Sequence, residues 1–125
     1  MMPQRSVYWI DSARLRLRAA RLLFDEGLYD DCVNRCFFSA FHAALGLLAS
    51  QDIATRSYTG AFTQLFVHFV RDGALSRTVH RKLHLLQDHR HLADYTDVSF
   101  DRTLAAEDVL NASEFIETVE ALLPG

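Results

Sequence analysis

The sequence of 125 residues contains few of the residues that interrupt helices, with five Gly and two Pro, one Pro near each end. Long stretches without either residue favour helices over an architecture of many short strands. Cysteine is also scarce, since Cys32 and Cys36 are the only two. Two cysteines cannot build a disulfide framework or a Cys-based zinc site, and free thiols suit a reducing cytosol.

Several functional signals are absent as well. The first residues, MMPQRS, lack an apolar signal core, and no apolar run approaches the length that a membrane span needs. The sequence contains no glycine-rich phosphate loop, no His-Glu-x-x-His, no nucleophile elbow and no Cys-x-x-Cys. We therefore expect a soluble, cytoplasmic protein without a membrane contact and without a standard hydrolase, kinase or dehydrogenase site.

Apolar residues are abundant, at half of the chain with nine Phe, which is enough to bury the core of a single domain over residues 1–125. They recur at spacings of three and four, the pattern of helices with one buried face. Gly27 is expected to end the first helix, Asp30 or Asp31 to cap the second, and Ser76 to cap the fourth. We predict an all-α antiparallel bundle of four to five helices with its core at about 8–123. The predicted helices are residues 8–26, 31–50, 60–71, 76–95 and 102–123.

The net charge of −3 conceals an uneven distribution along the chain. Residues 1–90 hold 12 of the 13 basic side chains and eight acidic ones, whereas residues 91–125 hold one Arg and eight acidic side chains. A basic first helix beside an acidic last helix is interpreted as complementary packing rather than as a nucleic-acid footprint.

The segment at 34–48, NRCFFSAFHAALGLL, is apolar nearly all round. Because such a helix must be covered on every side, we expect it to lie between its own bundle and a second copy of the chain, in a homodimer. The side predicted to meet the second copy carries Phe38, Phe41 and Leu45. Arg35 and His42 are seven residues apart, almost two helical turns, so they should share one narrow stripe with Ser39 and Gly46.

Arg90 breaks an otherwise apolar pattern in the fourth predicted helix. Val79, Leu83, Leu86 and Ala93 follow one another at spacings that place Arg90 where an aliphatic residue is expected. A guanidinium keeps its charge, so a semi-buried one needs a carboxylate, a phosphate or carbonyl groups. Two interpretations remain open for Arg35 and Arg90. One is an internal ion pair with Asp30, Asp31 or Asp94, and the other is an anion site for a nucleotide or RNA backbone.

Histidines offer a weaker signal. His42 is either a hydrogen-bonded core residue or, beside an Arg, an acid or base that works at neutral pH. His80 and His84 have the spacing of metal ligands, but no Asp, Glu or Cys completes a set nearby. We expect neither a metal ion nor another cofactor.

Two blocks of the sequence, in their order and spacing, closely resemble the small stand-alone prokaryotic branch of the HEPN superfamily. The first is Asn34-Arg35 with Phe41-His42-Ala43-Ala44, and the second is Arg90-x-x-Ala93-Asp94-Tyr95. The resemblance covers about residues 13–120. Phe37 and Phe38 stand where the family commonly has a Tyr pair, and Cys36 stands where it has Ala.

This resemblance implies a helical bundle that forms homodimers and is often encoded beside a minimal nucleotidyltransferase as a toxin–antitoxin pair. Many HEPN proteins are metal-independent ribonucleases that use an Arg-x4–6-His motif at a cleft between protomers. The equivalent Arg here is Arg90, and the positions five to seven residues later are Tyr95, Thr96 and Asp97. None of the three is His, so the resemblance implies a catalytic pair that is incomplete in this chain.

Our hypothesis for the site is one polar cluster that joins the two blocks. Arg90 and His42 are its catalytic candidates, and its nucleotide- or phosphate-binding candidates are Asn34, Arg35, Arg90, Asp94 and Tyr95. The alternative is a hydrogen-bonded network that only fixes the packing of the two helices.

Four functions are compatible with such a cluster. The first is a homodimeric toxin–antitoxin component that binds a nucleotide or RNA and acts with a nucleotidyltransferase partner. The others are a metal-independent ribonuclease toxin with a non-standard acid or base, an acceptor of a nucleotidyl group at Tyr95 or Tyr58, and a purely structural interaction module.

Overall fold

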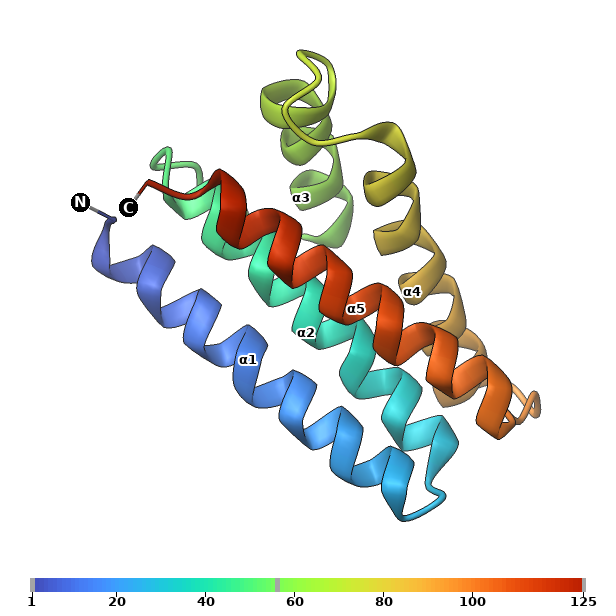
Figure 1. Cartoon of the computed structure of the whole chain (residues 1–125). Helices are drawn as coiled ribbons and strands as arrows, with labels where there is room; N and C mark the ends of the chain where they lie inside the picture. The colour runs from blue at the N-terminus through green and yellow to red at the C-terminus, as the bar shows by residue number, and fades with distance from the viewer. Residues whose placement is uncertain (1, 56, 125) are drawn as a thin grey trace.

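The computed structural model describes residues 2–55 and 57–124, and over that part of the chain it contains helices and no strand. Five α-helices and one π-helical turn follow one another along the chain, which confirms the predicted all-α bundle (Figure 1). They are α1 (Gln4–Asp25), α2 (Tyr29–Ala49), α3 (Tyr58–Leu65), η1 (Phe66–Val70), α4 (Arg77–Tyr95) and α5 (Arg102–Leu122).

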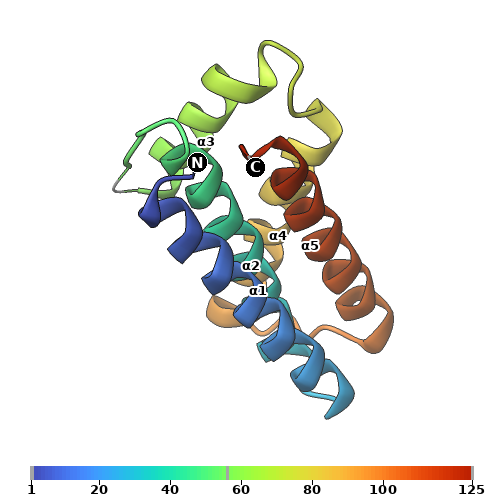
Figure 2. The same cartoon turned by 60° about the vertical axis from the view of Figure 1, so that its left-hand side comes forward.

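Helix α2 is the centre of the bundle. It contacts α1, α3, α4 and α5, and in both views α1 lies alongside it (Figures 1 and 2). The start of α1 and the end of α5 lie at the same end of the bundle (Figure 2). The side chains of α2 therefore meet a different neighbour on each face, which gives its apolar residues partners within a single chain.

The helix ends follow local chemistry, with two corrections to the predicted boundaries. Gly27 adopts a φ of 76° and ends α1, and Ser76 Oγ accepts a hydrogen bond from the Val79 N–H at 3.1 Å to cap α4, as predicted. Helix α1 begins earlier than expected, at Gln4. Helix α2 begins at Tyr29 rather than at an Asp cap, because the Asp30 carboxylate accepts the Phe100 N–H at 2.8 Å instead.

By length and composition alone, α2 is long and apolar enough to cross a membrane, which corrects the expectation that no run approaches that length. Yet 72% of the most apolar window of α2 is buried inside the bundle. Buried free Cys32 and Cys36 lie on this helix and belong to the same core. The distribution of burial is that of the core helix of a bundle.

Helix α1 and helix α5 carry complementary charges where they meet. Arg14 of α1 forms an ion pair with Glu120 of α5, and Arg21 donates a hydrogen bond to Ser113 Oγ at 3.3 Å. Part of the uneven charge distribution is therefore used in the packing of the first helix against the last.

A buried hydrogen bond between a histidine and a carboxylate joins α4 to α5. Asp108 is wholly buried, and both of its carboxylate oxygens lie 2.9 Å from His89 Nδ1, whose side chain is 19% exposed. Burial raises the pKa of Asp108 above its ordinary value, and the hydrogen bond and charge of His89 partly oppose that rise. His89 thus supplies most of the compensation that a carboxylate at this depth requires.

Replacing His89 should therefore destabilise the bundle. For His89→Ala we expect the free energy of unfolding at pH 7 to fall by about 3 kcal/mol, because removing one partner leaves a buried charge uncompensated. Urea unfolding followed by circular dichroism measures this. The matched control is His91→Ala, an exposed position on the same helix, which should change the value by less than about 0.5 kcal/mol.

The pH dependence of the stability of His89→Ala distinguishes an uncompensated Asp108 carboxylate from a simple loss of packing. A carboxyl group whose pKa is raised on folding contributes stability that is present at low pH and is lost as the pH rises through the raised pKa. The pKa of Asp108 rises further once His89 is gone, so His89→Ala should recover part of its stability at about pH 5. An equal loss at both pH values would contradict this account.

Candidate functional site

Arg90 of α4 lies inside a cage of aromatic rings rather than among aliphatic side chains. Its side chain is 11% exposed, and its Cζ is between 5.3 and 5.7 Å from four ring centroids. Such distances are those of cation–π contacts. The aromatic cage consists of Phe37, Phe38, Tyr58 and Tyr95. The prediction of a semi-buried Arg at this position is confirmed.

The guanidinium of Arg90 is incompletely paired. Its nearest carboxylate is that of Asp94, with Nη1 and Oδ2 3.9 Å apart, and Nε is buried with no hydrogen-bond partner. Arg90 donates no hydrogen bond to any side chain or backbone group within residues 2–55 and 57–124. A guanidinium has five N–H donors, so most of those on Arg90 remain available to an anion.

Asn34 and Asp94 complete the polar part of the site. Asn34 Nδ2 of α2 donates a hydrogen bond of 2.7 Å to Asp94 Oδ2, the same oxygen that faces Arg90. This contact links α2 to α4. Asp94 was one of the three carboxylates proposed as an ion-pair partner, so the ion-pair interpretation holds in part for Arg90, and the anion site stays a prediction.

Arg35 does not join this site. It is exposed to solvent and takes part in no hydrogen bond or ion pair with the described residues. The prediction that it is semi-buried beside Arg90 is wrong. Ser39, one turn later, is buried and donates to the Cys36 carbonyl at 2.8 Å, so the stripe becomes buried only beyond Arg35. The long side chain of an Arg near a helix end reaches water readily.

His42 is also separated from Arg90. It packs toward α1, where its Nδ1 is 2.8 Å from Ser12 Oγ and its ring centroid is 4.9 Å from that of Trp9. The two groups share a neighbour in Phe38, whose centroid is 6.3 Å from that of the His42 ring and 5.5 Å from Arg90 Cζ, but they form no hydrogen bond with each other among the described residues. The hypothesis that His42 reaches Arg90 across the bundle is not supported.

Burial, and secondly the positive charge of Arg16, lowers the pKa of His42 to about 4. The imidazole is therefore neutral near pH 7. Arg16 Nη1 donates to Ser12 Oγ at 2.7 Å, and a guanidinium can only donate. Ser12 is thus free to donate its own proton to Nδ1, which leaves the His42 proton on Nε2. A neutral, engaged His42 is a poor proton donor for chemistry at Arg90.

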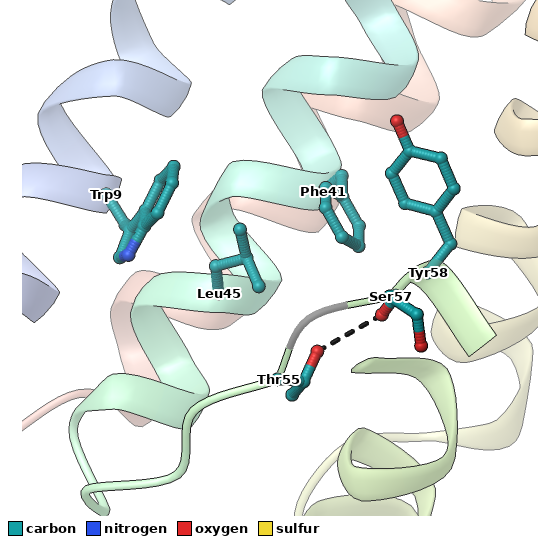
Figure 3. Close-up of a pocket in the computed structure, with 6 residues that line it drawn as sticks. All are labelled: Trp9, Phe41, Leu45, Thr55, Ser57 and Tyr58. Atoms are coloured by element: carbon teal, nitrogen blue, oxygen red, sulfur yellow. Dashed lines mark hydrogen bonds between the residues drawn. The ribbon is translucent and has the colours of Figure 1, made fainter. Parts of the chain in front are cut away.

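A pocket of about 430 Å³ adjoins the aromatic cage between α1, α2 and the segment before α3. Figure 3 shows Trp9 at one end and Tyr58 at the other, with Phe41 and Leu45 of α2 between them. Tyr58 belongs to both the pocket and the cage. The remaining lining residues are Thr55 and Ser57, and Thr55 Oγ1 donates to the Ser57 carbonyl at 3.1 Å.

Trp9, Ser12 and Arg16 were not predicted as members of a polar site. They recur at spacings of three and four on one face of α1, so the signal was present in the sequence. It was hidden because the same helix carries a second basic stripe on the α5 side, which includes Arg14 and Arg21.

His80 and His84 lie on one face of α4, with ring centroids 4.8 Å apart. Burial, and secondly the charge of His84, lowers the pKa of His80. Among residues 2–55 and 57–124, no three His, Cys, Asp or Glu side chains are grouped as a metal site requires.

Comparison with known proteins gives a consistent picture of relatedness. A family model described as HEPN domain matches residues 6–122. A Methanocaldococcus jannaschii protein named "Putative toxin MJ0605" is 27% identical over 114 residues, which cover 91% of this chain and 85% of that protein.

Two solved structures share the fold at lower identity. The crystal structure of TT1696 from Thermus thermophilus matches with a TM-score of 0.84 at 19% identity, covering 97% of this chain and 100% of that one. A tri-AMPylated HEPN toxin of Shewanella oneidensis, in complex with an MNT antitoxin, matches with a TM-score of 0.64 at 13% identity, covering 96% and 99%.

Proposed function

Because the chain belongs to the HEPN domain family, we propose that it is the toxin of a cytoplasmic toxin–antitoxin pair and binds nucleotide or RNA phosphate at Arg90. The antitoxin in this proposal is a minimal nucleotidyltransferase. Support comes from the name of the archaeal relative and from the toxin–antitoxin complex that shares the fold. The single observation that carries the binding site is the caged, incompletely paired guanidinium of Arg90.

The cage prepares Arg90 for an anion in two ways. Four rings fix the position of the guanidinium, so little side-chain freedom is left to lose when a ligand binds. The rings also leave only 11% of the Arg90 side chain exposed, and a charge interaction is stronger where the local dielectric constant is low. A planar fork of N–H donors matches the oxygens of a phosphate.

Binding is better supported than cleavage. Thr96 and Asp97 are exposed, and Thr96 Oγ1 is engaged with the Leu92 carbonyl at 2.6 Å. Neither supplies the imidazole that the family motif places here, and His42 faces α1. We therefore propose that Arg90 holds phosphate without the His of the family motif and without His42, and that a metal-independent ribonuclease activity, for which His91 beside Tyr95 is the nearest imidazole, is the weaker alternative.

Tyr95 gives a second candidate role to the same site. It is 68% exposed, and its ring centroid is 5.7 Å from Arg90 Cζ. In this role the Tyr95 oxygen would attack the α-phosphorus of ATP in a reaction catalysed by the partner. Pyrophosphate would leave and the phenolic proton would pass to solvent. The observation that favours it is an accessible hydroxyl beside a guanidinium that can hold the phosphates. Tyr58, at 36% exposure, is the less accessible of the two.

We also propose a homodimer, with a revised contact surface. Phe41 is 7% exposed because Tyr58 and Phe62 of the same chain cover it. The proposed dimer contact therefore no longer includes Phe41. Phe38 and Leu45 are half-buried and remain available. A second copy that packs on them would place Arg90 at the edge of a cleft between protomers.

The binding role predicts a selective loss of RNA affinity in Arg90→Gln. We expect the dissociation constant for a fluorescein-labelled single-stranded RNA, measured by fluorescence anisotropy, to rise at least about tenfold, as for the loss of a charged hydrogen bond. The salt dependence should fall by about one counterion. The matched control is Arg81→Gln, an exposed position on α4 with the same change in charge. Equal effects of the two variants would contradict the assignment.

The dimer predicts a molar mass of two chains in light scattering at micromolar concentration. Leu45→Glu should shift the mass toward one chain, because it places a charge in the apolar contact. Leu104→Glu, which changes an exposed Leu on α5, serves as the control and should leave the mass unaltered. A wild-type protein that scatters as a single chain would refute the dimer.

The nucleotidyl-acceptor role predicts a covalent change that intact-mass spectrometry detects. After incubation with ATP and the nucleotidyltransferase partner, the wild-type chain should gain at least one nucleotide. Tyr95→Phe should gain fewer, since only the reactive oxygen is lost, whereas Tyr8→Phe, an exposed tyrosine on α1, should behave like the wild type. An unmodified wild-type mass would exclude this role.

A further inference from the structure

Three residues of α1 form a polar arrangement that the Arg90 site does not use. Trp9, Ser12 and Arg16 lie along one face of the helix, and Ser12 and Trp9 contact His42 of α2. We call these four residues the α1–α2 seam. The seam borders the pocket, because Trp9 belongs to both.

Arg16 carries a fixed and uncompensated charge. It is half-buried, and its Nη1 donates to Ser12 Oγ at 2.7 Å and approaches the Ser12 carbonyl at 3.5 Å. Within residues 2–55 and 57–124 it forms no ion pair with a carboxylate, whereas Arg14 on the same helix is paired with Glu120. Arg16 therefore resembles Arg90, in that both are held in place and neither donates a hydrogen bond to a carboxylate among the described residues.

The pocket beside the seam has the chemistry of a site for a flat heterocycle. Its ends are the aromatic rings of Trp9 and Tyr58, and among the described residues its remaining lining is apolar or hydroxyl-bearing, with no acidic side chain. Figure 3 shows the two rings facing the pocket from opposite ends. Neither Trp9 Nε1 nor Tyr58 Oη takes part in a hydrogen bond with the described residues, so both polar atoms are available to a ligand.

The seam and the aromatic cage flank the same ring. The Phe38 ring is near both groups, since its centroid is 6.3 Å from that of the His42 ring and 5.5 Å from Arg90 Cζ. Arg16 of α1 is linked to His42 through Ser12, and its charge lowers the pKa of His42. The pocket adjoins both arrangements, because Trp9 of the seam and Tyr58 of the cage line it.

From this arrangement we infer that the chain binds single-stranded RNA, with one unstacked base in the Trp9–Tyr58 pocket and neighbouring phosphates on Arg16 and Arg90. The inference rests on the proposed phosphate-binding role of Arg90 and adds a second phosphate contact and a base site. Aromatic rings hold single-stranded bases by stacking, and positive side chains follow the backbone. Duplex RNA keeps its bases paired and cannot place one in the pocket.

The proposed dimer contact at Phe38 and Leu45 borders this pocket, because Leu45 also lines it, so the inference requires that the second copy leave the pocket open between Trp9 and Tyr58. A two-fold symmetric contact that covered the whole pocket would bring the Arg16 and Arg90 of both protomers toward the same face. Like charges would then meet, and only the loose pair of Arg90 with Asp94 would offset them. RNA instead brings the opposite charge together with a ring that can stack.

The single tryptophan of the chain makes the inference directly measurable. On titration of the full chain with an octamer of single-stranded oligoadenylate RNA, Trp9 emission should be quenched and should saturate together with binding measured by anisotropy. Duplex RNA of the same length should not quench it. Arg16→Gln should weaken oligoadenylate binding about tenfold, as for one lost charge-assisted contact. Arg18→Gln, an exposed position two residues away, should change it less than about twofold.

The other outcomes each decide a specific point. Binding that depends on Arg90 but neither quenches Trp9 nor responds to Arg16→Gln overturns this inference and leaves the proposed function intact. A wild-type protein that binds no oligoadenylate overturns both. A Trp9 emission that changes with protein concentration and not with RNA assigns the pocket to a second copy. Circular dichroism of each variant confirms that the helices are retained.

Discussion

The need to cover α2 on all sides determines how the rest of the chain is arranged. This helix buries apolar side chains toward α1, α3, α4 and α5, and burial of apolar surface is the main favourable contribution to folding. At Gly46 the lack of a side chain lets α1 approach closely, since an added Cβ would lie 2.8 Å from Ile10 Cδ1. The Ser6 hydroxyl donates to the Gly46 carbonyl at 2.6 Å across the same contact. The outer strip of α2 that stays partly open lies between α1 and α4.

That outer strip is where the polar groups of α1 and α4 collect. Arg90 comes from α4 and Arg16 from α1, and each is held by neighbours that do not neutralise it, namely aromatic rings and a Ser hydroxyl. Apolar packing of the central helix therefore places two cations on one face. The energetic cost of keeping them poorly paired is limited, since both side chains retain some contact with solvent. A ligand that carries negative charge would relieve it.

Sequence patterns were sufficient for the fold and only partly for the site. The five helices followed from apolar spacing and from Gly27 and Ser76, and the misplaced Arg90 was visible as a break in the stripe of α4. Spacing assigns a residue to a face of its helix, but it does not tell how far along the helix the neighbouring helix extends. The spacing therefore assigned Arg35 to a semi-buried face of its helix, yet its side chain is exposed to solvent. His42 was assigned an inward face, and the packing of α1 against α2 turned it toward Ser12.

The Arg16–Ser12–His42 chain also bears on the choice between binding and cleavage. A general acid or base works best when its pKa is near the working pH, whereas burial and Arg16 hold that of His42 at about 4. The Ser12 hydroxyl further engages Nδ1, so the ring is oriented but not poised to exchange a proton. The contacts that make His42 a poor proton-transfer group also hold the guanidinium of Arg16 in a fixed position beside it. A surface with two fixed guanidinium groups and aromatic rings, beside a His42 that is held neutral, is suited to holding an RNA strand rather than cutting it.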